Sequence, residues 1–174
     1  MARQRSQPRF DPYAILAGLE QEHVTYIIVG AFARVIHGAD EITRGIDFTV
    51  STREENLRRL DVALEHINAE RADGRKLSLQ STDFERELVV GLRSDHGELK
   101  IVPYPEGTRG YDDLRRAAER QPIGRGLRPS VASPGDLARM LSALGREQDI
   151  PKLTMMRRLI ELERSLHRGL SIER

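Results

Sequence analysis

The sequence contains no cysteine. This absence excludes disulfide bonds, zinc sites built on thiolates and cysteine nucleophiles. Long hydrophobic runs are also missing, because no apolar stretch approaches the ~20 residues that a membrane-spanning helix needs. The first ten residues, MARQRSQPRF, are basic but lack the apolar core of a signal peptide. We therefore expect a cytoplasmic protein with no membrane partner.

The composition is otherwise that of an ordinary soluble globular protein. The chain has 174 residues, of which 39% are hydrophobic and 32% are charged. This length is most simply one domain, and it is large enough to bury a substantial core. The formal net charge of +1 points to no particular partner.

The distribution of arginine is more informative than the net charge. An N-terminal group comprises Arg3, Arg5 and Arg9, and a later group comprises Arg115, Arg116, Arg120, Arg125, Arg128, Arg157, Arg158, Arg164 and Arg168. These side chains could form a face that binds RNA. The alternative is that they lie on solvated helix faces, and the acidic residues interleaved with them favour this interpretation.

Capping residues and apolar spacing predict the helices. Asp11-Pro12 and Ser133-Pro134 are typical helix starts, since Asp or Ser caps and proline takes the first position. Ser51 and Thr52 each precede a glutamate by three residues, which is the pattern of a capping box. We predict helices over about 12–23, 31–37, 52–69, 111–120, 134–144 and 149–166.

Strands are predicted from β-branched and apolar runs that end in turn residues. We expect them over about 25–29, 46–50, 76–80, 87–93 and 98–102, followed by a hairpin over 122–131. The element order is therefore that of a mixed α/β (α+β) protein, with a small sheet, helices on one of its faces and a helical C-terminal part. We expect a flexible basic arm over 1–10 and one domain over 11–174. Its core covers about 11–106 and its helical part about 107–174.

One stretch, VGAFARVIHGADEITRGIDFTV over residues 29–50, carries the main functional signal. An apolar strand ends at Gly30, and a lone carboxylate, Asp47, opens the next strand. Together with Val131–Leu137 and Gly145–Asp149, this stretch resembles the motifs of the nucleotidyltransferase superfamily. The similarity is to the minimal nucleotidyltransferases and the type IV abortive-infection toxins, and it spans roughly residues 12–165.

The resemblance implies an activity and its cofactors. Such proteins transfer a nucleotide from an NTP to RNA or protein, with two Mg²⁺ ions about 3.5–4 Å apart on an Asp-x-Asp pair and a third Asp on a later strand. Alternate residues of a strand face the same way, so Asp-x-Asp presents two carboxylates together. Backbone amides near the first glycine receive phosphate oxygens. Toxin-like members also imply a cognate antitoxin as partner.

This sequence departs from the family pattern at the residues that would bind the metal ions and the nucleotide. Gly45 stands where the first Asp is expected, and Lys100 aligns with the third. The arginine of the loop is replaced by Glu41, and the lysine of the tail segment by Leu141. Of the three metal-binding carboxylates, only Asp47 remains.

The resemblance still assigns roles to particular residues. Asp47 is the candidate catalytic residue and metal ligand, and Glu98 is the candidate second ligand because it faces the same side of its strand as Lys100. The candidate nucleotide- or phosphate-binding residues are Gly30, Ala31, Thr43, Arg44, Lys100 and Arg146. Alternatively, Asp47 is a structural carboxylate that pairs with Lys100 or Arg44, and Arg146 pairs locally with Asp149.

Three functions remain open at this point. Because only one of the three metal-binding carboxylates is present, the sequence favours a relative that has lost or much reduced nucleotidyl transfer. Such a relative would act as a binding or regulatory module. The second is an active, Mg²⁺- and NTP-dependent, toxin-like nucleotidyltransferase acting on RNA or protein. The third is a nucleic-acid-binding protein that uses its arginine-rich tail.

Overall fold

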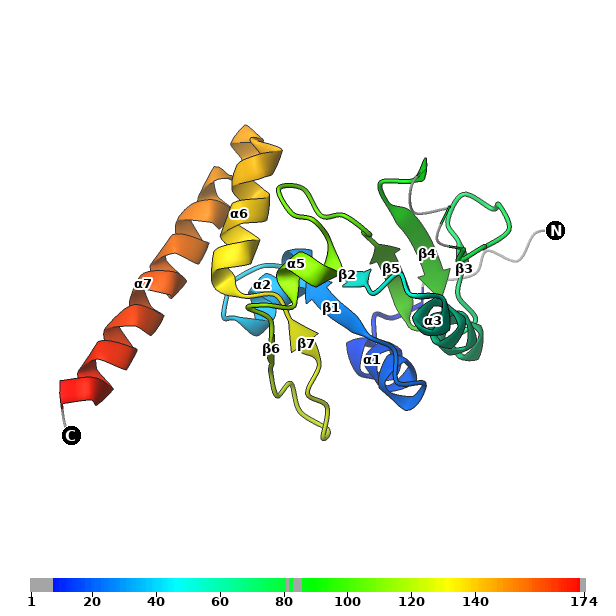
Figure 1. Cartoon of the computed structure of the whole chain (residues 1–174), viewed down its shortest axis with the longest axis horizontal. Coiled ribbons are helices and arrows are strands. Elements are labelled where there is room, and N and C mark those ends of the chain that lie inside the picture. Colours follow the sequence, from blue (N-terminus) through cyan, green and yellow to red (C-terminus); the bar gives the residue numbers. More distant parts are fainter. Residues whose placement is uncertain (1–7, 81, 83–85, 173–174) are drawn as a thin grey trace.

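A seven-stranded mixed sheet forms the centre of the molecule in the computed structural model, which describes residues 8–80, 82 and 86–172 (Figure 1). The strand order is β3-β4-β5-β2-β1-β7-β6. The strands are β1 (Tyr26–Val29), β2 (Gly45–Val50), β3 (Glu70–Arg71), β4 (Val90–Ser94), β5 (Gly97–Ile101), β6 (Glu119–Arg120) and β7 (Ser130–Val131). The predicted α/β class with a mixed sheet is confirmed.

Six α-helices and one 3₁₀ helix accompany the sheet within the described residues. They are α1 (Pro12–Gln21), α2 (Gly30–Ile36), α3 (Glu54–His66), α5 (Tyr111–Leu114), α6 (Pro134–Leu144), η1 (Glu147–Asp149) and α7 (Ile150–Ile172). No helix of the described part of the chain is long and apolar enough to cross a membrane. The division into an arm and one domain stays a prediction, and residues 1–7 lie outside the described residues.

The three central strands fix the register of the site. β2 pairs antiparallel with β1, which places Val29 opposite Asp47. β2 also pairs in parallel with β5, which places Glu98 opposite Gly45 and Lys100 opposite Asp47. Because neighbouring residues in register share a face, these charged side chains all lie on one side of the sheet.

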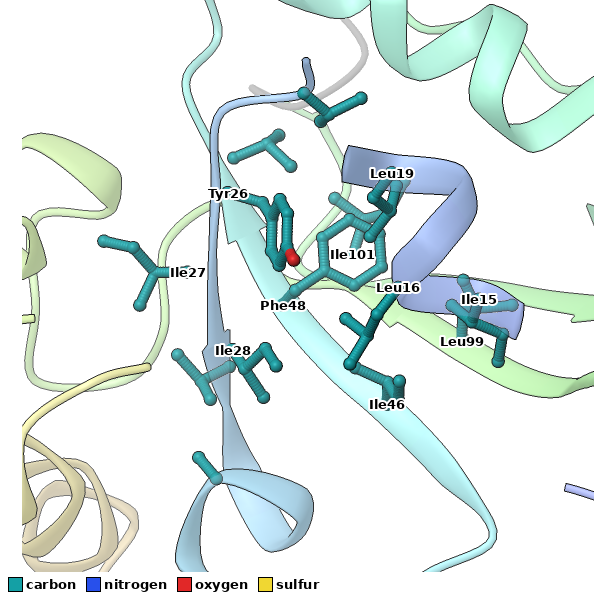
Figure 2. Close-up of a cluster of buried hydrophobic side chains, with 14 of the residues drawn as sticks. Ile15, Leu16, Leu19, Tyr26, Ile27, Ile28, Ile46, Phe48, Leu99 and Ile101 are labelled. Carbon is teal, nitrogen blue, oxygen red and sulfur yellow. The ribbon is translucent and has the colours of Figure 1, made fainter. Parts of the chain in front are cut away.

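The opposite side of the sheet carries the hydrophobic core. Ile46 and Phe48 of β2 are fully buried there against Leu16 of α1 (Figure 2). Tyr26 adds an edge-to-face ring contact with Phe48, with 6.2 Å between the ring centroids. α1 in turn packs on α3. The charged residues of β2 and β5 therefore project away from the main core.

The prediction that helices cover only one face is wrong at β1. All four residues of this strand are buried, although successive side chains point to opposite faces. Ile27 points away from Phe48 in Figure 2, and α5 contacts β1. Both faces are covered here because α2 and α5 both pack against β1, whereas Glu98 and Lys100 on the open face of β5 are exposed.

The predicted side-chain caps are present at the starts of α1 and α6 but not at the start of α3. Asp11 accepts a hydrogen bond from the Ala14 amide, and Ser133 accepts one from the Asp136 amide. The capping box before α3 is wrong, since the cap is Arg53 and no side chain caps it. Asn56 instead donates to the carbonyls of Ser51 and Thr25, which ties the start of α3 to β1.

Other boundaries also differ from the prediction. Residues 76–80 form no strand, because β3 takes the place beside β4. The strand predicted over 87–93 begins only at Val90. The helix predicted over 111–120 ends at Leu114, because Glu119 and Arg120 pair with β7. The predicted hairpin over 122–131 is therefore present, but its first strand begins earlier, at Glu119. The last helix, α7, extends beyond its predicted end at residue 166.

Candidate functional site

The turn from β1 into α2 brings Gly30 against the carboxylate of Asp47. Gly30 has a φ of +70°, in the left-handed region that favours glycine. A Cβ added at Gly30 would lie 2.7 Å from Asp47 Oδ2, so the carboxylate occupies the space of a side chain. Ala31 follows, half-buried, in the first turn of α2. The structure therefore brings Gly30 and Asp47 together as the resemblance implied.

Asp47 is a largely buried carboxylate without a close partner. Burial raises its pKa, and the positive charges of Lys100 and Arg34 oppose this rise. Among the described residues, no hydrogen bond or ion pair within 4.0 Å is formed by its side chain. The predicted ion pair with Lys100 or Arg44 is therefore wrong at contact distance, and Lys100 acts on Asp47 from further away.

β5 presents the two other charged groups of the site. Glu98 and Lys100 are both exposed, and both lie on the face that carries Asp47. Glu98 lies beside Gly45, the position where the family pattern has its first carboxylate. Lys100 lies directly beside Asp47 in the neighbouring strand. The site thus has a largely buried carboxylate, Asp47, and two exposed groups of opposite charge, Glu98 and Lys100, on one face of the sheet.

Gly45 is held so close to β5 that no side chain fits there. A Cβ at this position would lie 2.6 Å from the carbonyl oxygen of Glu98 and 3.2 Å from its Cβ. The φ of Gly45 lies outside the left-handed region, so the obstacle is space rather than backbone conformation. The obstructing atom belongs to the backbone of a paired strand, which cannot rotate away as a side chain would.

The donor set does not fit two Mg²⁺ ions. Magnesium requires several oxygen ligands in near-octahedral geometry, and a pair of ions needs carboxylates that reach both. Across the described residues, no group of three or more His, Asp or Glu side chains is arranged to hold a metal. Asp47 and Glu98 are the carboxylates on this face of β2 and β5, and Lys100 adds a positive charge beside them.

The loop between α2 and β2 is held by its own hydrogen bonds. Thr43 Oγ1 donates to the Gly45 carbonyl at 2.8 Å, so this hydroxyl is already engaged in a turn. Arg44 is exposed. His37, at the C-terminal end of α2, has its Nε2 2.8 Å from the Ala132 carbonyl oxygen. Candidate phosphate contacts at Thr43 and Arg44 stay predictions.

A bidentate ion pair fixes the same loop to α2. Arg34 Nε lies 2.6 Å from Glu41 Oε2, and its Nη2 lies 3.0 Å from Oε1. Arg34 is only 7% exposed. Sequence reasoning missed Arg34, because Glu41 lies in the loop beyond the end of α2 and no helical spacing links the two residues. Glu41, which stands where the resemblance implied an arginine, therefore neutralises a buried arginine whose charge acts on Asp47.

The joint between α6 and α7 contains the predicted local pair. Arg146 Nε lies 2.6 Å from Asp149 Oδ2, and this hydrogen bond holds the pKa of Asp149 below its ordinary value. Among the described residues, Asp149 Oδ1 accepts no hydrogen bond by distance and angle, but Lys152 Nζ lies 3.5 Å from it as an ion pair. Lys152 also lies 3.9 Å from Glu41 Oε1.

These contacts join the C-terminal helices to the candidate site through a chain of charges. It runs from Arg146 through Asp149, Lys152 and Glu41 to Arg34, whose charge acts on Asp47. Arg146 itself has no described contact with Asp47. Its role as a phosphate ligand stays a prediction, whereas its structural role at the helix joint is visible.

Comparison with solved structures identifies the fold. A protein from Thermotoga maritima, described as a "putative nucleotidyltransferase", matches 92% of this chain and 89% of its own at a TM-score of 0.53 and 17% identity. The antibiotic-resistance factor ANT(2'')-Ia matches 92% of this chain and 91% of its own at a TM-score of 0.55 and 14% identity. The chain has the nucleotidyltransferase fold.

Sequence comparisons add nothing to this assignment. No protein-family model matches the chain, and no curated protein matches it either. At such low identities, the likeness to solved structures carries the fold but not the activity. The function of this nucleotidyltransferase-fold chain has to be argued from its own site.

Proposed function

We propose that this chain keeps the nucleotidyltransferase fold as a binding or regulatory module whose nucleotidyl transfer is lost or much reduced. The observation that carries the proposal is the closed position at Gly45, where the Glu98 carbonyl leaves no room for a carboxylate side chain. Lys100, in register with Asp47, adds a cation where a third ligand would be needed. Two-metal transfer requires both carboxylate positions.

The ligand in this proposal is a nucleotide that is bound and not transferred. The exposed side chains of Arg44 and Lys100 supply positive charges that would attract its phosphates. A protein partner, such as a cognate antitoxin, is the other form that a regulatory module takes. Neither form needs the two-metal arrangement.

A transfer assay tests the proposal directly. The wild-type chain and the Asp47→Asn variant would be incubated with each radiolabelled NTP, Mg²⁺ or Mn²⁺, and RNA or protein acceptors. We expect no labelled product above the level of the variant. Robust labelling that depends on Asp47 would contradict the proposal. Circular dichroism of both proteins would establish that they are equally folded.

One observation favours a second candidate, an active enzyme dependent on Mg²⁺ and NTP. Glu98 lies beside Gly45 on the face of Asp47, so its carboxylate is near the position of the missing one. In an active enzyme of this kind, Asp47 and Glu98 would hold the metal and supply the charge stabilisation of nucleotidyl transfer. The same assay separates the two, because this candidate requires that Asp47→Asn and Glu98→Gln each abolish labelling.

Nucleic-acid binding through the arginine-rich part is a third candidate. Arg116 and Arg128 are exposed and form no ion pair among the described residues, whereas Arg115 lies 3.2 Å from Asp112. An electrostatic footprint of this kind predicts that affinity for RNA falls steeply as salt rises. RNA binding that is insensitive to salt, or no binding at low salt, would contradict it.

A further inference from the structure

The C-terminal half of α7 extends away from the rest of the molecule (Figure 1). Its N-terminal half packs on α6 and buries Met156 completely. Beyond it, every residue over 161–170 is exposed. A free helical segment of fewer than ~12–15 residues is only marginally stable in water. The end of α7 would therefore gain stability from a covering partner.

This free half carries an apolar stripe that continues the packed surface of the helix. Leu159 is half-buried against the core, and Leu162, Leu166 and Leu170 follow at spacings of three and four residues. Such spacing places them along one helix face. The three outer leucines are 60%, 68% and 70% exposed. Clustered exposed leucines of this kind mark an interaction surface.

The charges beside the stripe complement a second copy of the same helix. Arg158 lies on one flank of the leucines and Glu163, five residues later, lies on the other. In two parallel helices packed along such a stripe, Arg158 of each copy faces Glu163 of the other. An antiparallel alignment that stacks Leu162 on Leu166 would instead bring the two Glu163 carboxylates together. Within the described residues, neither Arg158 nor Glu163 has an ion pair in its own chain.

We infer that α7 pairs in parallel with α7 of a second copy through Leu159, Leu162, Leu166 and Leu170. A nucleic acid would require one sign of charge, but the free half of α7 mixes Arg164 and Arg168 with Glu161 and Glu163. The contact is separate from the site at Asp47 and places no residue in it. Because it involves about three turns of helix, the dimer forms with moderate affinity and dissociates on dilution.

Sedimentation of the full chain over a wide concentration range tests the pairing. We expect the mass to move from one chain to two, and Leu166→Glu to weaken association about tenfold or more. Leu88→Glu is the matched control, because Leu88 is 87% exposed and precedes β4, at the other end of the molecule from α7. A chain that stays monomeric, or a dimer that Leu166→Glu leaves intact, would overturn the inference.

Disulfide cross-linking tests the relative direction of the two helices. Because the chain has no native cysteine, any disulfide must involve the introduced one. In a parallel pair, Leu162→Cys and Leu166→Cys each meet their own copy at a distance that a disulfide spans, so both variants cross-link on oxidation. Arg158→Glu and Glu163→Arg should each weaken the dimer, and the double variant should restore it. Cross-linking of only one cysteine variant, or of neither, would refute the parallel arrangement.

Discussion

Gly30 and Gly45 both lie next to Asp47, and they are glycines for different physical reasons. Gly30 needs a left-handed backbone and also yields its side-chain space to the Asp47 carboxylate. Gly45 has no such backbone requirement, and is kept small by the Glu98 carbonyl. The resemblance in sequence implies that Gly45 is a missing carboxylate. In the structure it is a position that β5 has closed.

Restoring the family carboxylate is therefore expected to fail. We predict that Gly45→Ala and Gly45→Asp each lower the free energy of unfolding by about 1–3 kcal/mol, because an added Cβ overlaps a backbone oxygen of a paired strand. Urea unfolding measures the change. Gly135→Ala is the control, since its Cβ would meet only Ser133 Oγ at 3.9 Å and should be neutral or slightly stabilising. A stable Gly45→Asp variant that gains Mg²⁺ binding would contradict this geometry.

The ionisation of Asp47 predicts a pH dependence. Because burial raises its pKa in the folded state, ionisation of Asp47 opposes folding above that pKa, and this cost vanishes below the unfolded value of ~3.8. Asp47→Asn should therefore be more stable than the wild type at pH 7, and the difference should shrink as the pH falls toward 4. Unfolding by urea at several pH values checks this.

Asp113 provides a control of opposite sign for the same experiment. The Arg109 amide and Arg139 hold its pKa below the ordinary value, so its charge stabilises the fold above ~pH 4. Asp113→Asn should be less stable than the wild type at pH 7, with a difference that also shrinks in acid. If both variants changed stability in the same direction, the assigned electrostatics of Asp47 would be wrong.

Among the elements, the joint of α6 and α7 is held by one buried carboxylate, that of Asp149. Asp149 is 2% exposed and binds Arg146 on one side and Lys152 on the other. The pair with Lys152 continues to Glu41, so the joint and the loop before β2 are linked. Loss of Asp149 would leave Lys152 and Arg146 without their shared anion.

We predict that Asp149→Ala lowers the free energy of unfolding by about 1–3 kcal/mol, because a buried, charge-assisted hydrogen bond is removed. Urea unfolding at pH 7 would measure it. Glu54→Ala is the matched control, since its ion pair with Arg58 is largely exposed and should change stability by less than ~0.5 kcal/mol. Equal effects of the two substitutions would rule out a structural role for the buried joint.

The elements that could be predicted from sequence are those with local signals. Asp11 and Ser133 fix the starts of α1 and α6 through hydrogen bonds to amides three residues later. The errors at 76–80 and 111–120 arose where distant pairing decided the outcome, since β3 occupies the edge beside β4 and β6 pairs with β7. Alternating or helical periodicity within those segments carries no information about which other segment of the chain pairs with a strand.

At the scale of the whole molecule, the sequence motifs predicted the nucleotidyltransferase fold, and the structure brings four of the candidate site residues together. Gly30, Asp47, Glu98 and Lys100 come together because β1, β2 and β5 are neighbours in the sheet. The sequence could not reveal that β5 closes Gly45, or that Arg34 and Lys152 join the charges around Glu41. Those features depend on how closely segments distant in sequence approach one another in the fold, and no pattern within a single segment of the sequence encodes them.

The most direct test of the central claim is electron paramagnetic resonance of Mn²⁺ bound to the protein, with and without a non-hydrolysable NTP. A two-metal nucleotidyltransferase site would hold two Mn²⁺ ions about 3.5–4 Å apart, which gives an exchange-coupled spectrum. We predict no coupled pair, and no difference between the wild type and Asp47→Asn in the count of tightly bound ions. A coupled Mn²⁺ pair that disappears in Asp47→Asn would contradict the account.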